Sequence, residues 1–235
     1  MKKKIMLLLI IAMIFISSVS VFARAGGGGG GGGGSSSSYH SSGSSASNSV
    51  ASLVQMAVFA VAASGGSIVF IKKARRAKRK SLREMKVLAQ IEENWNADEI
   101  QRQIEESYFQ IQECWRRMDT SYGAAYLSEE LQREFDIKIQ WMQIRNEEVV
   151  QKDVKLLSAA PIAVINEEGE EKDTIWYLIH GKMTGYYIDR NTRLIIRGRN
   201  KPEAFYEYWK FVYRNKRWVL AEIKQKDEID IDVFG

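Results

Sequence analysis

Two long apolar runs precede a region in which apolar residues recur at helical spacing. The first run, residues 5–23, carries no charged side chain and follows three lysines, a pattern typical of a secretory signal peptide. The second run, residues 50–71, is 22 residues long without an ionisable side chain. As a helix it would measure about 33 Å, against about 30 Å for a hydrocarbon core, and we therefore predict a transmembrane helix over residues 50–71. The alternative is a buried core helix, because Gly65, Gly66 and many alanines lower the hydrophobicity per residue.

Residues 1–25 are predicted to be either a signal peptide or an uncleaved anchor. Ala23-Arg24-Ala25 places small residues at the two positions that signal peptidase reads, which favours cleavage. An uncleaved anchor is the alternative, because 19 uncharged residues suffice to span a bilayer. Residues 26–49 then form a linker of nine consecutive glycines followed mainly by serines. Glycine loses the most entropy on ordering and this tract has almost nothing to bury, so we predict a flexible coil.

Helical periodicity begins near residue 81 and defines two amphipathic helices. The apolar residues of the first are Ile100, Ile104, Tyr108, Ile111, Trp115 and Met118, and those of the second are Leu131, Phe135, Ile139 and Met142. Each set forms one stripe along a helix. Asn96, with Glu99 three residues later, predicts a capped N-terminus at which these two residues bond reciprocally. Ser128 predicts the N-cap of the second helix, which should end near Arg145.

β-Branched and aromatic residues take over from about residue 149. We predict strands over residues 154–165, 174–189, 194–196, 204–214 and 217–224, separated by polar or Gly- and Pro-containing turns. Asn215-Lys216 predicts a tight hairpin turn between the last two strands. Two or three helices followed by such a meander predict an α+β domain, with the helices packed on one face of a curved antiparallel sheet.

The charge distribution divides the chain into two parts. Residues 1–83 hold 12 Lys and Arg and no acid, whereas the remainder holds 22 Lys and Arg against all 29 Asp and Glu, so 22 − 29 = −7. Eight basic residues crowd the segment 72–83 directly after the second apolar run: Lys72, Lys73, Arg75, Arg76, Lys78, Arg79, Lys80 and Arg83. We expect this juxtamembrane segment to contact anionic lipid head groups. Nucleic acid is a less favoured partner, because the position beside a span already accounts for the charges.

An excess of basic residues marks the cytoplasmic end of a span, so we predict a cell-membrane protein whose domain, residues 84–235, lies in the cytoplasm. Cleavage after the first run leaves a single pass. An uncleaved first run gives two passes and places the domain on the same side. The single cysteine, Cys114, agrees with a cytoplasmic location, where disulfides are rare. The length and charge of residues 84–235 predict that this part folds alone.

The last two strands resemble those of a known family. Residues 204–214 contain Glu-x-Trp-x-Phe and residues 218–223 contain Trp-x-Leu-x-x-Ile, as in the closing hairpin of Tim44-like domains. Residues 111–119 and 126–131 are similar to the helical part of that family, and the N-terminal layout is similar to its bacterial membrane-anchored members. The resemblance covers roughly residues 99–225. It implies an NTF2-like cone, in which a curved sheet wraps around helices and encloses a cleft, and a module or tether that binds a protein partner or an apolar ligand at the membrane.

Candidate ligand-cleft residues lie on two of the predicted strands. They are Trp176, His180, Glu207, Trp209 and Phe211. The two-residue period of a strand places Glu207 on one face with four aromatic residues: Phe205, Trp209, Phe211 and Tyr213. We expect this carboxylate to form an ion pair with Arg197, Arg199 or a lysine of a neighbouring strand.

A catalytic role is the alternative, with Glu207 or His180 as general base in a membrane-tethered NTF2-like enzyme acting on a small apolar substrate. His180 lacks an orienting partner on its own strand, because Asp189 is an odd number of residues away and points to the opposite face. The sequence contains no Ser/His/Asp set, metal-ligand cluster or nucleotide loop. We therefore expect a binding function without a catalytic residue, a metal or a cofactor.

Overall fold

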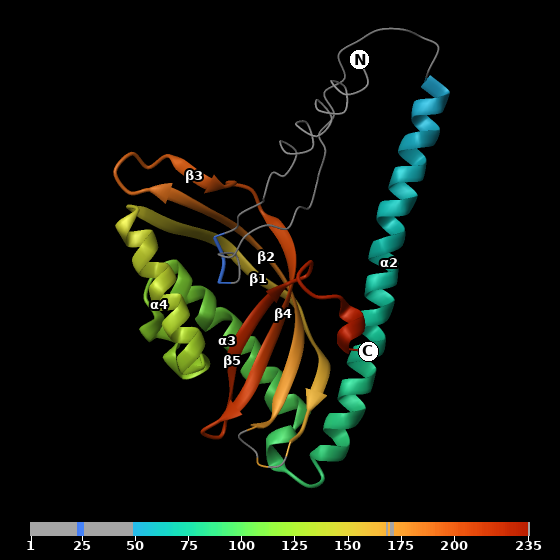
Figure 1. Ribbon diagram of the computed structural model, residues 1–235, viewed down its shortest axis with the longest axis vertical. Helices are drawn as coiled ribbons and strands as arrows, with labels where there is room; N and C mark the ends of the chain where they lie inside the picture. The colour runs from blue at the N-terminus through green and yellow to red at the C-terminus, as the bar shows by residue number, and fades with distance from the viewer. Residues whose placement is uncertain (1–22, 26–48, 168, 170–171, 235) are drawn as a thin grey trace, which may run out of the picture.

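A computed structural model describes residues 23–25, 49–167, 169 and 172–234, with the side chains of residues 49–67 left out of the description. Figure 1 shows a curved sheet with helices α3 and α4 on one side and the long helix α2 on the other. The predicted signal segment up to residue 22 and the predicted linker up to residue 48 lie outside the described residues. The domain is therefore α+β, with helices packed against an antiparallel sheet.

The sheet follows the predicted meander. Its strands are β1 Glu147–Ile165, β2 Thr174–Asp189, β3 Ile195–Gly198, β4 Glu203–Arg214 and β5 Arg217–Gln225. They lie in the order β1-β2-β4-β5 with β3 added to β2, and all neighbours are antiparallel. β1 starts earlier than predicted, because residues 147–152 pair with the end of β2. Three register shifts along β1 bend this edge strand, and Pro161 is tolerated there because an edge strand leaves N–H positions unpaired.

Local signals place the helices and the last turn. In α3, Ala97–Arg117, the Asn96 side chain accepts from the N–H groups of Asp98 and Glu99, each at 3.1 Å. The reciprocal bond expected from Glu99 is wrong: its carboxylate accepts instead from Arg102 and from the Gln103 amide. Ser128 caps α4, Glu129–Ile144, as predicted. Asn215 and Lys216 both have positive φ, 49° and 61°, which confirms the tight hairpin turn.

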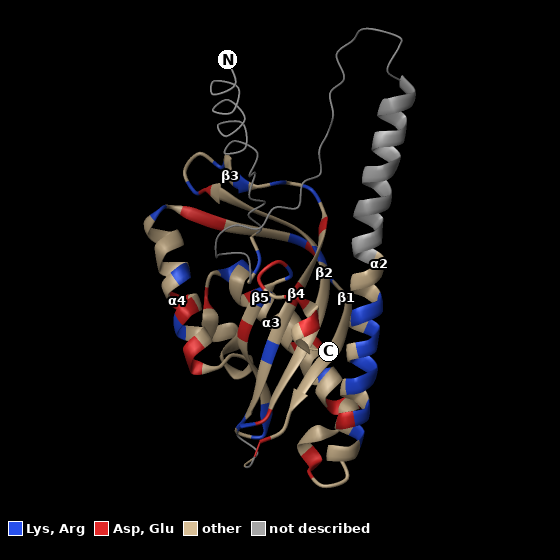
Figure 2. Cartoon of the chain, turned by 45° about the vertical axis from the view of Figure 1, so that its right-hand side comes forward, with Lys and Arg blue, Asp and Glu red and all other residues tan. Residues whose placement is uncertain are grey.

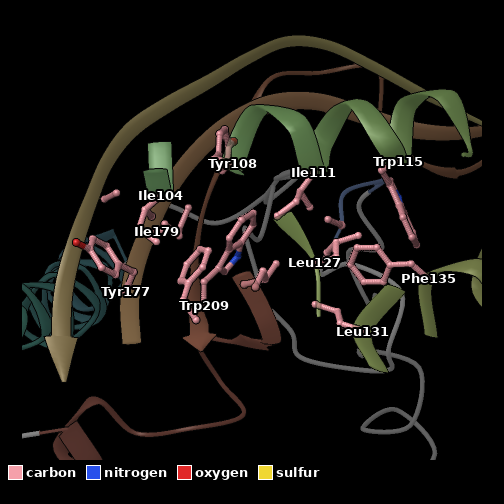
Figure 3. Packing of buried hydrophobic residues seen from close by; sticks show 14 of the residues in the cluster. Ile104, Tyr108, Ile111, Trp115, Leu127, Leu131, Phe135, Tyr177, Ile179 and Trp209 are labelled. Atoms are coloured by element: carbon pink, nitrogen blue, oxygen red, sulfur yellow. The ribbon is translucent and has the colours of Figure 1, made fainter. Parts of the chain in front are cut away.

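The inner face of the sheet, which carries Tyr177, Ile179, Glu207 and Trp209, packs against α3 and α4. Both predicted helical stripes are buried in this core, together with Trp95 and Trp218. Figure 3 shows Tyr177 toward one end of the core and Trp115 and Phe135 toward the other, with Tyr108 and Trp209 between them. The short 3-10 helix η1, Glu93–Trp95, precedes α3, and a second one, η2, Thr120–Tyr126, connects α3 to α4.

The outer face of the sheet, which carries Trp176, Leu178, His180 and Tyr208, is also covered, contrary to the prediction of helices on one face only. Helix α2, Ser49–Leu88, and the 3-10 helix η4, Ile231–Phe234, pack on it through Ala77, Ile231 and Phe234. The cover is required because Trp176, Leu178 and Tyr208 would otherwise expose a continuous apolar surface.

Helix α2 continues past residue 71 without a break. Its residues Ala77, Ser81 and Met85 are buried, and Phe70 and Ala74 are partly buried against the outer cluster, so the packing of the domain begins before residue 84. Within the described part of the chain, no helix has the length and apolar character needed to cross a membrane.

Replacement of Trp218 tests the inner core. Trp218 is 1% exposed, contacts Trp95 at 5.0 Å between ring centroids, and donates from Nε1 to the Asn94 carbonyl at 3.1 Å. We expect Trp218→Ala to lower the free energy of unfolding by about 3–5 kcal/mol in denaturant titrations followed by circular dichroism. Trp141→Ala is the matched control, because this ring is 56% exposed, and should change stability by less than about 0.5 kcal/mol.

The boundary of the folded unit can be tested with two fragments. A fragment of residues 67–235 keeps the part of α2 that covers Trp176 and Leu178, whereas a fragment of residues 84–235 loses it. We expect the shorter fragment to be less stable by at least about 2 kcal/mol, since loss of one buried large apolar contact costs about 1.5–3 kcal/mol. Equal thermal and denaturant midpoints for the two fragments would show that α2 is dispensable for the fold.

Candidate functional site

A buried polar cluster lies within the apolar inner face of the sheet. Glu207 of β4 is 0% exposed, and its strand neighbours on the same face, Phe205 and Trp209, are buried with it. The carboxylate accepts from the indole Nε1 of Trp209 at 2.9 Å and from the amide of Gln225, on β5, at 3.1 Å. A buried carboxylate needs a positive partner as well as neutral donors, because the desolvation cost of the charge is large.

Arg24 is that partner. Its Nε donates to Glu207 Oε1 at 2.5 Å, and a second nitrogen donates to the side-chain oxygen of Gln225. The guanidinium carbon lies 4.2 Å from the centroid of the Phe205 ring, in cation–π contact. The expectation that Glu207 forms an ion pair is confirmed, but the expected partners were wrong. Arg197, on β3, pairs instead with Glu147, the first residue of β1.

The segment Ala23-Arg24-Ala25 fills the cleft between the inner face and α3. The three residues are 0%, 7% and 2% exposed. The amide of Gln151 donates to the Ala23 carbonyl at 2.6 Å and to the Gln112 side chain at 3.1 Å. The tripeptide that the sequence predicts as a signal-peptidase site is therefore enclosed by the domain in this structure.

Tyr108 and Gly181 close the cleft beside Glu207. The Tyr108 hydroxyl donates to the Lys155 carbonyl at 3.3 Å, and its ring lies 5.6 Å from Trp209. Burial, and secondarily the nearby Glu207 charge, raise the pKa of Tyr108, so its phenol is neutral at physiological pH. A Cβ on Gly181 would lie 2.6 Å from this hydroxyl, so the close approach of α3 to β2 requires glycine here.

The five candidate cleft residues divide between the two faces of the sheet. Glu207, Trp209 and Phe211 lie on the inner face, whereas His180 and Trp176 lie on the outer face under α2 and η4. His180 stacks on Tyr206 with ring centroids 4.1 Å apart, and burial lowers the pKa of its imidazole. The Trp176 ring contacts Phe234 at 5.1 Å.

Asp189 does not orient His180, in agreement with the expectation from strand period. Its carboxylate accepts from the N–H groups of Asn191 and Thr192 and holds the turn after β2. Among the described residues, no group of three or more His, Cys, Asp or Glu side chains has an arrangement that could hold a metal ion. The cleft therefore offers hydrogen bonds and one paired charge to a ligand.

Arg24, Gln225, Gln151 and Gln112 were missed by the sequence analysis. Gln112 lies four residues after Tyr108 and is 2% exposed, and Gln151 shares one face of β1 with the buried Val149. Two amide side chains on otherwise apolar faces therefore indicate a polar cleft, because buried polar groups need hydrogen-bond partners. Arg24 gave no such signal, because its local surroundings fit a targeting segment.

The second feature of interest is the basic face of α2. Figure 2 shows Lys and Arg gathered along the lower half of this helix. The exposed members are Lys72, Arg75, Arg76, Lys78, Arg79, Lys80 and Arg83, while Lys73 is partly buried and pairs with Asp232. These charges lie on the solvent side of α2, opposite the residues that pack on the sheet.

The fold and cleft define an α+β domain of the NTF2-like class, in which a bent antiparallel sheet holds helices against its inner face. The chain belongs to the Tim44-like domain family, whose model matches residues 80–225. No curated protein matches the chain.

Two solved structures show limited similarity. The crystal structure of the intermembrane space region of the chloroplast protein ARC6 is 8% identical, with a TM-score of 0.37, and the match covers 53% of this chain and 95% of that one. The solution structure of a SEC-C motif containing protein from Rhodopseudomonas palustris is 15% identical, with a TM-score of 0.23, and the match covers 48% of this chain and 70% of that one. At these TM-scores neither structure supports a conclusion about the function of this chain.

Proposed function

We propose that this protein is a membrane-anchored interaction module, in which residues 50–71 span the cell membrane and the Tim44-like domain binds a protein partner or an apolar ligand in the cytoplasm. The observation that carries the proposal is the continuity of α2. One helix of 40 residues joins the apolar run to the part that packs on the sheet. A domain attached through an unbroken, packed helix is held close to the membrane in a fixed orientation.

The dimensions of α2 support this arrangement. A span of residues 50–71 uses about 33 Å of helix, and residues 72–88 add about 25 Å, over which the inner side packs on the domain. The exposed basic residues then lie at the cytoplasmic lipid surface. Each Lys or Arg close to an anionic leaflet contributes about 1 kcal/mol of attraction, so the basic face would hold the domain against the membrane.

The orientation follows from the same charges. An excess of Lys and Arg directly after a span favours the cytoplasmic side for that end. A cleaved first run gives one pass and an uncleaved first run gives two, and both place the domain in the cytoplasm.

Binding is favoured over catalysis by the state of the two candidate bases. Glu207 accepts from Gln225 at Oε1 and from Trp209 at Oε2, so each of its oxygens has a donor within the domain itself. His180 lies on the other face of the sheet, stacked on Tyr206. The two groups thus do not share a cleft.

A topology assay tests the anchoring. A reporter enzyme that functions only in the cytoplasm should be active when it is fused after residue 235, whereas one that functions only outside the cytoplasm should be inactive. Protease added to intact cells should leave the domain uncut. Permeabilised cells, in which the same protease reaches the domain, are the control. Digestion of residues 84–235 in intact cells, or a soluble full chain that does not sediment with membranes, would refute the proposed anchoring.

Charge reversal tests the contribution of the basic face. Replacement of Arg75, Arg76 and Arg79 by Glu should weaken the binding of the fragment 67–235 to vesicles containing anionic lipid by about 100-fold or more, at about 1 kcal/mol per lost positive charge. The matched control is reversal of Arg102, Arg116 and Arg117, three arginines that are exposed on α3. An equal loss of vesicle binding in both variants would mean that net charge alone, and not this face, attracts the lipid.

A further inference from the structure

The cleft around Glu207 has the chemistry of a cation site. The carboxylate is fully buried, and its neutral donors, Trp209 and Gln225, leave its charge uncompensated. Arg24 supplies the compensating charge through Nε, and its guanidinium lies over the Phe205 ring. Arginine suits such a site better than lysine, because its planar group both stacks on an aromatic ring and donates in fixed directions.

The cleft also contacts the backbone that carries the arginine. Gln151 donates to the Ala23 carbonyl at 2.6 Å, and Gln112 accepts from the same amide nitrogen at 3.1 Å. A Cβ on Gly185 would lie 3.2 Å from that carbonyl oxygen and 3.4 Å from the Ala23 nitrogen. Ala23 and Ala25 are enclosed, so larger residues on either side of the arginine would collide with the walls. The contacts therefore select a segment, bent at residues 23–24, in which an arginine stands between small residues.

We propose that this cleft is a binding site for such a segment of a partner protein, and that Ala23-Arg24-Ala25 is the occupant supplied by the same molecule. This inference goes beyond the proposed membrane-anchored module. It rests on that proposed function only for the compartment, the cytoplasm, in which the domain binds the partner. Both proposed topologies separate residues 23–25 from the domain: cleavage removes them with the signal peptide, and an uncleaved first run leaves them on the opposite side of the membrane. In an inserted molecule the carboxylate of Glu207 therefore takes its arginine from a cytoplasmic partner.

The site is tested with the full chain in detergent, carrying Arg24→Ala so that the resident arginine does not compete. The probe is a fluorescent, end-capped peptide of residues 20–28, and binding is followed by fluorescence anisotropy. We expect it to bind at least about 10-fold more tightly than the same peptide with alanine in place of arginine, since a hydrogen bond to a charged group contributes that much or more. Adding Glu207→Gln to the protein should weaken binding by at least about 10-fold.

Control variants separate recognition from folding. Gly185→Leu, whose Cβ would meet the Ala23 backbone at 3.2 Å, should abolish binding and provides the test if Glu207→Gln does not fold. Arg102→Ala, on the exposed side of α3, should bind as before. Equal binding of the arginine and alanine peptides, or undiminished binding by Gly185→Leu, would overturn the proposal. Displacement of the peptide by free arginine at the same concentration would show a site for small guanidinium compounds instead.

The wild-type chain distinguishes this proposal from the membrane topology. In detergent, the wild type should bind the peptide at least about 10-fold more weakly than Arg24→Ala, because a tethered competitor has an effective concentration in the millimolar range. Equal binding of the peptide by the wild type and by Arg24→Ala in detergent would overturn the proposal that residues 23–25 of the same molecule occupy the cleft. In membrane vesicles with the cytoplasmic side outward, both chains should bind equally. If the wild type bound the peptide more weakly than Arg24→Ala in vesicles as well, the result would contradict the proposed topology but not the proposed arginine-binding site.

Discussion

Strand β2 is apolar on both faces, and the rest of the architecture depends on covering it. Of its 16 residues only Lys182 is exposed, with His180 and Asp189 partly buried. A strand with this pattern needs a layer on each side. Helices α3 and α4 form the inner layer, and α2 with η4 forms the outer layer. The outer layer makes α2 part of the domain, so a helix that would otherwise be a free linker has its orientation set by the sheet.

The inner face adds a second constraint, because one carboxylate is buried among aromatic rings. Removal of one member of a buried ion pair costs about 3–5 kcal/mol, since the other charge is left without a partner. Glu207 therefore links the stability of the domain to the presence of a cation in the cleft. Any ligand that supplies this cation binds the folded domain and stabilises it by mass action.

Local patterns predicted most of the fold, and the contacts that escaped prediction are distant in sequence. The stripe from Ile100 to Met118 and the inner face of β4 follow from periods of 3.6 and 2. The outer layer was missed because Ala74, Ala77 and Ser81 are small and lie among basic residues, so charge hid their packing face. The contact of Arg24 with Glu207 spans 183 positions and has no local signature.

Ala23-Arg24-Ala25 fits two roles because both require small residues on either side of the central position. A peptidase and a narrow cleft each exclude large side chains at these positions. In the proposed topology the two roles differ in the compartment they need, since the cleft would lie in the cytoplasm and the cleavage site on the opposite side of the membrane. Tethering through a Gly/Ser tract would keep the segment at millimolar effective concentration and block weaker partners. Separation by a bilayer would remove that competition without any change in the cleft, so membrane insertion itself would make the Glu207 site available.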